Sequence, residues 1–137
     1  MTPSSLRSTA LRRVSETEWP ITAPDVDIRD RKVMDIAGEE LGTVTDLLVD
    51  IREHRVQFIE VASGGFLGLG QTTFLLPVAA IVRIMDDTIY VTPTQQQVQQ
   101  APRYEPTMRQ REDSALGHYA DLHRHYNYPP YGELRAL

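Results

Sequence analysis

Apolar and polar positions alternate between residues 41 and 61 in a way that is typical of short β-strands. Residues 41–50 (LGTVTDLLVD) and 56–61 (VQFIEV) are rich in β-branched residues, and their apolar positions suit strands with a buried face. The alternation shifts phase between Thr45 and Leu47. A β-bulge, or burial of both strand faces at a corner, would explain this shift. We therefore expect two antiparallel strands with an irregularity in the first.

Turn residues flank this pair of strands. Asp35 can close a turn by accepting hydrogen bonds from its own backbone, and Gly38 can adopt a positive φ, so residues 35–40 predict a tight turn. Residues 52–55 (REHR) predict the connection between the two strands, in which His54 is a turn residue facing water.

Further strands are predicted on the C-terminal side. Residues 73–77 (TFLLP) form a strand that ends at a proline, which cannot donate to a sheet and therefore lies at a sheet edge or a strand end. Residues 78–84 continue as an apolar strand, and residues 88–91 (TIYV) form the last one.

Two helices are predicted after the strands. Thr92 followed by Pro93 and by Gln95 is typical of a capped helix N-terminus, so we expect a short helix over residues 93–100 with Thr92 as its N-cap. Residues 113–126 carry aromatic and apolar side chains at intervals of three and four, which predicts an amphipathic helix.

The order of these elements resembles the PRC-barrel family over about residues 27–92. The resemblance depends on five short motifs arriving in order: Val33-x-Asp35, Gly38-Glu-Glu-x-Gly42, Asp46-x-x-Val-Asp50, Arg55-Val56 and Phe74-Leu-Leu-Pro77. Similar sequences usually carry glycine in the turn before the Arg-Val pair, where this chain has His54. The family includes the barrel of the photosynthetic reaction-centre H subunit and that of a ribosome-maturation factor, and it has many stand-alone bacterial members.

The resemblance implies a mainly β fold: a small PRC-type β-barrel of about six short strands, with a short helix after the last strand. We expect three regions: a flexible N-terminal arm over residues 1–24, the barrel domain over residues 25–100, and a Tyr/His-rich C-terminal tail over residues 101–137 with its own helix. Within the arm, Leu6, Ala10, Leu11 and Val14 have helical spacing, so a short helix is the alternative.

Charge and composition exclude several function classes. Residues 25–100 hold twelve acidic and six basic side chains, and the whole chain has a formal net charge of −5. Such a surface does not suit a nucleic-acid backbone, so we expect no direct nucleic-acid binding. The absence of cysteine excludes disulfides and thiolate metal sites. We find no secretory signal and no apolar run long enough for a transmembrane segment, and we expect a cytoplasmic protein.

A glycine-rich segment, residues 63–71 (SGGFLGLGQ), carries large apolar side chains on a flexible backbone. Phe66, Leu67 and Leu69 have two alternatives: they fold back to plug one end of the barrel, or they stay exposed and bind a partner. A homodimer contact would satisfy both, so these three residues are candidate partner-binding residues.

The C-terminal tail contains five of the six tyrosines. Tyrosine offers a large contact area at a low entropic cost, so Tyr126, Tyr128 and Tyr131 are further candidates for partner binding. The tail either packs on its own barrel or reaches a second protomer or another protein.

Three polar residues of the tail have the spacing of helical metal ligands. His118 and Asp121 are three residues apart, and Asp121 and His125 are four apart, so the trio can share one helix face. No further ligand completes a tetrahedral site, so we expect solvent-facing histidines and treat these residues as weak metal candidates.

The favoured function is a non-enzymatic protein–protein interaction or scaffold module that forms a homodimer and docks on a macromolecular partner, as the barrel does in the relatives named above. No serine has a nucleophile-elbow setting and no carboxylate pair has an obvious apolar pocket, so we expect no catalysis and no cofactor. The alternatives are a metal-responsive binding protein and an RNA-processing or ribosome-associated accessory factor. Peripheral association with a membrane complex is compatible with the favoured function.

Overall fold

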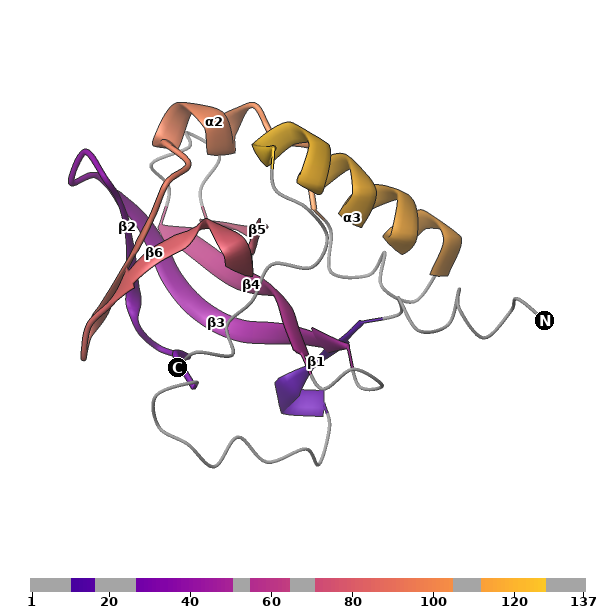
Figure 1. The fold of residues 1–137 in the computed structure, drawn as a ribbon, viewed down its shortest axis with the longest axis horizontal. Helices are drawn as coiled ribbons and strands as arrows, with labels where there is room; N and C mark the ends of the chain where they lie inside the picture. Colours follow the sequence, from indigo (N-terminus) through magenta and orange to yellow (C-terminus); the bar gives the residue numbers. More distant parts are fainter. Residues whose placement is uncertain (1–10, 17–26, 51–54, 65–70, 105–111, 128–137) are drawn as a thin grey trace.

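The described residues are mainly β, and they form one seven-stranded sheet and two α-helices (Figure 1). The computed structural model describes residues 11–16, 27–50, 55–64, 71–104 and 112–127. The strands are β1 (Arg12–Arg13), β2 (Lys32–Asp35), β3 (Glu40–Asp50), β4 (Arg55–Gly64), β5 (Gln71–Pro77), β6 (Ile81–Ile84) and β7 (Thr88–Val91). The helices are α2 (Gln95–Gln99) and α3 (Glu112–Tyr126), and two 3₁₀ turns are η1 (Val14–Glu16) and η2 (Val78–Ala80).

The strands are hydrogen-bonded in the order β5-β4-β3-β2-β7-β6, and β1 joins the sheet by pairing with β3. All described pairs are antiparallel except β2–β7, which is parallel. The sheet is curved like a small barrel but is not closed, because β5 and β6 are the ends of this order. The expected mainly β fold is confirmed, and the strand beyond the expected six is β1, which comes from the N-terminal segment.

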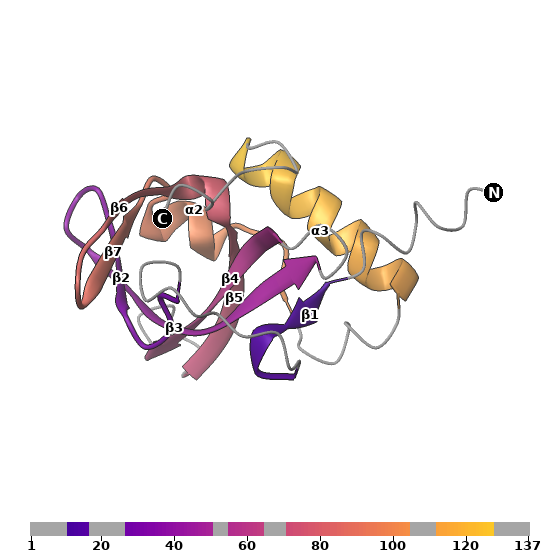
Figure 2. The same ribbon diagram turned by 60° about the horizontal axis from the view of Figure 1, so that its bottom comes forward.

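Two halves of the sheet differ in what covers them. We call β3, β4 and β5 the α3 half, because α3 packs against β4 and β5. We call β2, β7 and β6 the β6 half. In both views α3 and the β6 half lie at opposite ends of the molecule (Figures 1 and 2).

The irregularity expected between residues 45 and 47 is confirmed. The pairing of β3 with β4 shifts register between Val44 and Asp46, and again between Leu48 and Val49. Leu47, Leu48 and Val49 are all fully buried, although neighbouring residues of a regular strand point to opposite faces. The bulge and the burial of both faces therefore occur together. The connection over residues 51–54, including His54, lies outside the described residues.

The turn between β2 and β3 has the expected Asx geometry. The carboxylate oxygen Oδ1 of Asp35 accepts hydrogen bonds from the backbone N–H groups of Ala37 and Glu39, both at 2.9 Å, and Gly38 has a φ of 89°. Gly42 is required for a different reason. Its φ is 150°, and a Cβ there would lie 2.3 Å from the backbone oxygen of Ala62 on β4.

The predicted N-cap of the short helix is wrong by two residues. Thr94, not Thr92, caps α2, and it forms a capping box with Gln97. The N–H of Thr92 instead donates to the carbonyl of Ala80 at 3.0 Å, so Thr92 is bonded to the end of η2. Both threonines have a glutamine three residues later, and this contact between segments decides between them.

The expected strand over residues 78–84 is also only partly correct. Residues Val78–Ala80 form the 3₁₀ turn η2, and the strand β6 begins at Ile81. The break follows Pro77, which has no N–H to continue the sheet. The turn lets the chain pass from β5, at one end of the strand order, to β6 at the other.

The N-terminal segment is docked on the sheet where it is described. Arg12 pairs with Val49 and Arg13 with Leu48, and Val14 is buried. The helix considered as the alternative does not form at Arg12 and Arg13, which are extended and pair with β3 beyond the end of β2, and Val14 begins the 3₁₀ turn η1. The rest of the predicted arm lies outside the described residues.

The hydrophobic core is continuous from the sheet to α3. It includes Leu41, Leu47, Ile59 and Leu76 from the strands and Leu122 from the helix, each of them 0 to 1% exposed. The helix predicted over residues 113–126 is confirmed as α3 at Glu112–Tyr126. Its buried residues recur every three or four positions, so the amphipathic pattern positions α3 on the core.

Candidate functional site

Five of the six predicted partner-binding residues lie outside the described residues. These are Phe66, Leu67 and Leu69 of the glycine-rich segment and Tyr128 and Tyr131 of the tail. Their assignment stays a prediction, and so does the choice between a barrel plug and an exposed contact.

The sixth, Tyr126, is buried at the end of α3. It is 5% exposed, and its ring packs edge-on against His125 with centroids 4.7 Å apart. Its hydroxyl has no hydrogen-bond partner in the described part of the chain, and burial raises the pKa of this hydroxyl. A partner could contact Tyr126 only after α3 had moved, so in this arrangement Tyr126 is part of the core.

The three weak metal candidates do not converge. His118 is buried, Asp121 forms a salt bridge with Arg124, and the Nε2 atom of His125 donates to the backbone carbonyl of Gln97 at 2.8 Å. Among the described residues, no group of three histidine or acidic side chains could hold a metal ion. The expectation that the tail histidines face solvent is wrong for His118, which is 6% exposed.

Helix α3 packs on its own sheet through aromatic contacts. Phe58 on β4 lies 5.2 Å from the ring of Tyr119 and 4.9 Å from the ring of His123, measured between centroids. Such pairs add stability beyond the buried area alone. For residues 112–127, the structure therefore agrees with the first of the two alternatives for the tail, packing on its own barrel.

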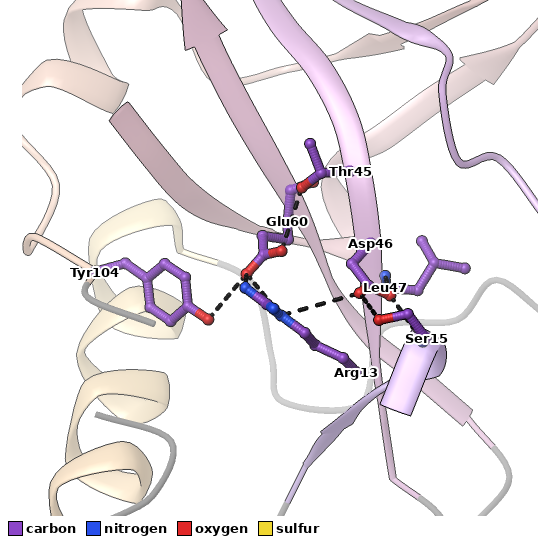
Figure 3. A network of polar contacts seen from close by, with 7 residues as sticks. All are labelled: Arg13, Ser15, Thr45, Asp46, Leu47, Glu60 and Tyr104. Atoms are coloured by element: carbon purple, nitrogen blue, oxygen red, sulfur yellow. Dashed lines mark hydrogen bonds and ion pairs between the residues drawn. The ribbon is translucent and has the colours of Figure 1, made fainter. Parts of the chain in front are cut away.

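A network of buried polar side chains joins β1 to β3 and β4 in the α3 half (Figure 3). Asp46 on β3 and Glu60 on β4 are cross-strand partners, and they are 4% and 3% exposed. Arg13 from β1 reaches both carboxylates. Its Nη2 donates to Glu60 Oε2 at 2.8 Å, and its Nε lies 3.9 Å from Asp46 Oδ2. A buried carboxylate is costly without such partners, so Arg13 offsets the cost of both.

Neutral donors also bind both oxygens of each of these carboxylates. On the Asp46 side, Oδ1 accepts from the N–H groups of Ser15 at 3.2 Å and Leu47 at 2.9 Å, and Oδ2 accepts from the hydroxyl of Ser15. On the Glu60 side, Thr45 donates to Oε1 at 3.2 Å and Tyr104 donates to Oε2 at 3.0 Å.

The network ties three parts of the chain together: the β1–η1 segment through Arg13 and Ser15, the sheet, and the segment after α2 through Tyr104 (Figure 3). Every carboxylate oxygen already has a donor, so this arrangement anchors chain segments.

The sequence contained only a weak signal for this network. Acidic residues at turns, such as Asp35, were assigned to turn chemistry, and that assignment is confirmed for Asp35. Asp46 and Glu60 lie instead inside strands, where acidic residues are uncommon. Their pairing depends on the register of β3 with β4, which the bulges shift, so the spacing along the chain could not reveal it.

The β6 half has a different surface. The exposed large apolar side chains of the described residues all lie there: Ile36 at 66%, Val82 at 57% and Met85 at 43% exposed. Ile36 follows β2, Val82 lies on β6, and Met85 follows β6. They do not form one patch: Met85 accepts a hydrogen bond from Arg31, next to the start of β2, whereas Ile36 follows the end of that strand. Val82 and Met85, on β6 and just after it, are the exposed apolar side chains that a partner of this half would cover.

Of the helices in the described ranges, none has the length and hydrophobicity to cross a membrane. In a comparison with protein families, the model of the PRC-barrel domain matches residues 22–98, more than half of the 137 residues. The matched range begins before β2 and ends within α2, so it contains both halves of the sheet and excludes β1 and α3.

Proposed function

This chain belongs to the PRC-barrel family, and we propose that it is a non-enzymatic docking module that forms a homodimer and binds a macromolecular protein partner. The PRC-barrel domain is a generic interaction or scaffold domain, which supports the general class of this function. The finer statements, the dimer and the surface that it uses, are argued below from the described residues.

One observation carries the proposal: Val82 on β6 and Met85 just after it are large apolar side chains that are 57% and 43% exposed. Their exposure costs free energy in water, and contact with another protein would recover it. In a two-fold contact each residue is used twice, so a few exposed side chains per protomer supply a larger apolar area. We therefore propose that the exposed side chains of the β6 half contact a second copy of this chain.

The polar groups support a structural role in place of a catalytic one. Asp46 and Glu60 are buried and fully bonded by Arg13, Ser15 and their neighbours, so they have no free oxygen to offer a substrate. We do not propose metal-responsive binding, because His118, Asp121 and His125 do not converge. We also do not propose a role in RNA processing. We expect the module to act in the cytoplasm, which fractionation of the native host would test.

The experiment is a measurement of molar mass by light scattering after size-exclusion chromatography, over a range of protein concentrations. We expect the wild-type chain to have twice the monomer mass and Val82→Asp to have the monomer mass, because a carboxylate in an apolar contact is strongly unfavourable. The matched control is Gln96→Asp, which places the same charge on the exposed face of α2 and should stay dimeric.

Two further variants test the alternative contacts predicted from the sequence. Phe66→Asp tests the glycine-rich segment, and removal of residues 128–137 tests Tyr128 and Tyr131. Loss of the dimer in either of these, with Val82→Asp still dimeric, would move the interface away from the β6 half. A wild-type chain that is monomeric at all concentrations would overturn the homodimer.

A further inference from the structure

His118 is buried between α3 and the segment that follows α2. Its ring is stacked on that of Tyr104, with centroids 5.7 Å apart and an interplanar angle of 22°, and it lies 6.3 Å from the ring of Tyr119. Its Nε2 atom is buried and has no hydrogen-bond partner among the described residues. A buried polar atom without a partner is destabilising, so this position is not optimised for stability.

Few charged groups could stabilise a positive charge on this ring. On α3 itself, Asp121 lies one turn further along, but its side chain is half exposed and forms a salt bridge with Arg124. Tyr104 lies on the facing segment, but its hydroxyl already donates a hydrogen bond to Glu60. On β4, Phe58 contacts the rings of Tyr119 and His123 and brings no charge.

We propose that protonation of His118 releases α3 from the sheet, so that mildly acidic conditions expose the face of the α3 half that the helix covers. The neutral ring tolerates an environment of aromatic carbon. The imidazolium carries N–H groups at both ring nitrogens and a net charge, and at Nε2 it meets no acceptor in the described part of the chain. Release of the helix returns this nitrogen to water.

The direction of the pH dependence follows from the burial. Burial lowers the pKa of His118 below its ordinary value of 6.5, and the opposing effect of Asp121 is smaller. In the released helix the pKa of His118 is close to the ordinary value. The docked state is therefore fully stable above pH 6.5, and it loses stability as the pH falls from 6.5 towards the lowered pKa.

The released state is expected to be local, with the sheet intact. The strands are held by their own backbone ladder, and the network at Asp46 and Glu60 does not include any residue of α3. Helix α3 is joined to the sheet by side-chain packing and not by a backbone ladder, and such an element can open independently of the rest of a protein. The face uncovered in this way includes Phe58, whose ring lies against α3 in the docked state.

A cysteine placed under the helix measures the release directly. The chain has no cysteine of its own, and Ala115 is buried on the inner face of α3, so Ala115→Cys gives one thiol that reacts when α3 leaves the sheet. The labelling rate is divided at each pH by that of the same variant unfolded in urea, which corrects for thiolate formation. Amide hydrogen exchange in β4, measured in parallel, shows whether the sheet stays folded.

Below pH 6.5 we expect the protection of the thiol from labelling to fall by up to about tenfold per pH unit, because release of α3 is coupled to the uptake of one proton. The amides of β4 should stay protected from exchange over the same range. Adding His118→Phe should remove this dependence, because phenylalanine keeps the ring and cannot be protonated. The matched control, His123→Phe on the same helix, should retain it.

Equal pH dependence with and without His118→Phe, flat protection in the parent variant, or loss of β4 protection together with that of the thiol would each overturn the proposal. The pKa of His118 in the unmodified chain, measured by NMR of the imidazole nitrogens, is a second test that needs no variant. A value at or above 6.5 would also overturn it.

Discussion

The α3 half and the β6 half are made of the same kind of strand and both bury apolar side chains, yet they differ in what covers them. In the α3 half, Phe58 is covered by a helix, and the buried carboxylates Asp46 and Glu60 bond to other segments of the chain. The β6 half buries Val33, Ile89 and Val91 but leaves Val82 exposed. We therefore expect substitutions beneath α3 to lower stability far more than substitutions at Val82.

The buried polar groups of the α3 half have a role that apolar residues could not fill. Leucine in place of Asp46 or Glu60 would bury as much area, but it would accept no hydrogen bond from Arg13, Ser15 or Tyr104. Directional bonds select which segment docks and in which register, whereas apolar contact is not directional. The network thus accounts for the docking of β1 and of the segment after α2 on one face.

We expect the largest loss of stability from Phe58→Ala, a substitution in the α3 half. The ring is fully buried beneath α3, and removing it should lower the free energy of unfolding by about 3–5 kcal/mol. The matched change in the β6 half, Val82→Ala, should alter it by less than about 0.5 kcal/mol at protein concentrations where the chain is monomeric, because that side chain is then exposed. Urea denaturation followed by circular dichroism measures both, and similar losses would remove the distinction between the halves.

A smaller loss is expected when the N-terminal segment is detached from the network. Arg13→Met keeps the apolar stem of the side chain but leaves Asp46 and Glu60 without this cation, so we expect a loss of about 2 kcal/mol, within the range for hydrogen bonds to charged groups. Arg12→Met, one residue earlier on β1 and exposed, is the control and should change little. The same denaturation measurement applies, and equal effects of the two changes would show that the network does not anchor β1.

The smallest effect is expected from an exposed glycine of α3, and it has the opposite sign. A Cβ at Gly117 meets no atom within 4 Å, so Gly117→Ala should stabilise the helix by about 0.5–1 kcal/mol. The control in the β2–β3 turn is Gly38→Ala, where space is also free but the φ of 89° strains any other residue. We expect a higher melting temperature for the first variant and a lower one for the second; an unchanged value for Gly117→Ala would show that α3 adds no stability.

Sequence reasoning predicted the elements that short-range patterns determine. The bulged strand β3, the Asx turn at Asp35 and the helix α3 each follow from residues within a few positions of one another. It failed where distant contacts decide. Thr92, which Pro93 follows, is the predicted cap, but Thr94 caps α2 and the N–H of Thr92 donates to Ala80 of η2.

The candidate sites were less predictable than the fold for the same reason. His118 has the helical spacing of a metal ligand and of a surface residue alike, and its burial depends on Tyr104, which reaches it from another segment. Likewise, Val82 lies at the register shift between Ile81 and Arg83 in the pairing of β6 with β7, so the face to which it points depends on that pairing. Neither the burial of His118 nor the exposure of Val82 can be predicted from the residues next to it in the sequence.

The parallel pairing of β2 with β7 has a consequence for the order of events during synthesis. β3, β4 and β5 can pair with their sequence neighbours as they leave the ribosome, but β2 gains its second neighbour only when β7 has been made. We therefore expect a nascent chain that ends before β7 to hold an antiparallel meander with one side of β2 unpaired. Such an unpaired edge is prone to aggregation, so the last strand of the sheet also ends the period in which the growing chain is vulnerable.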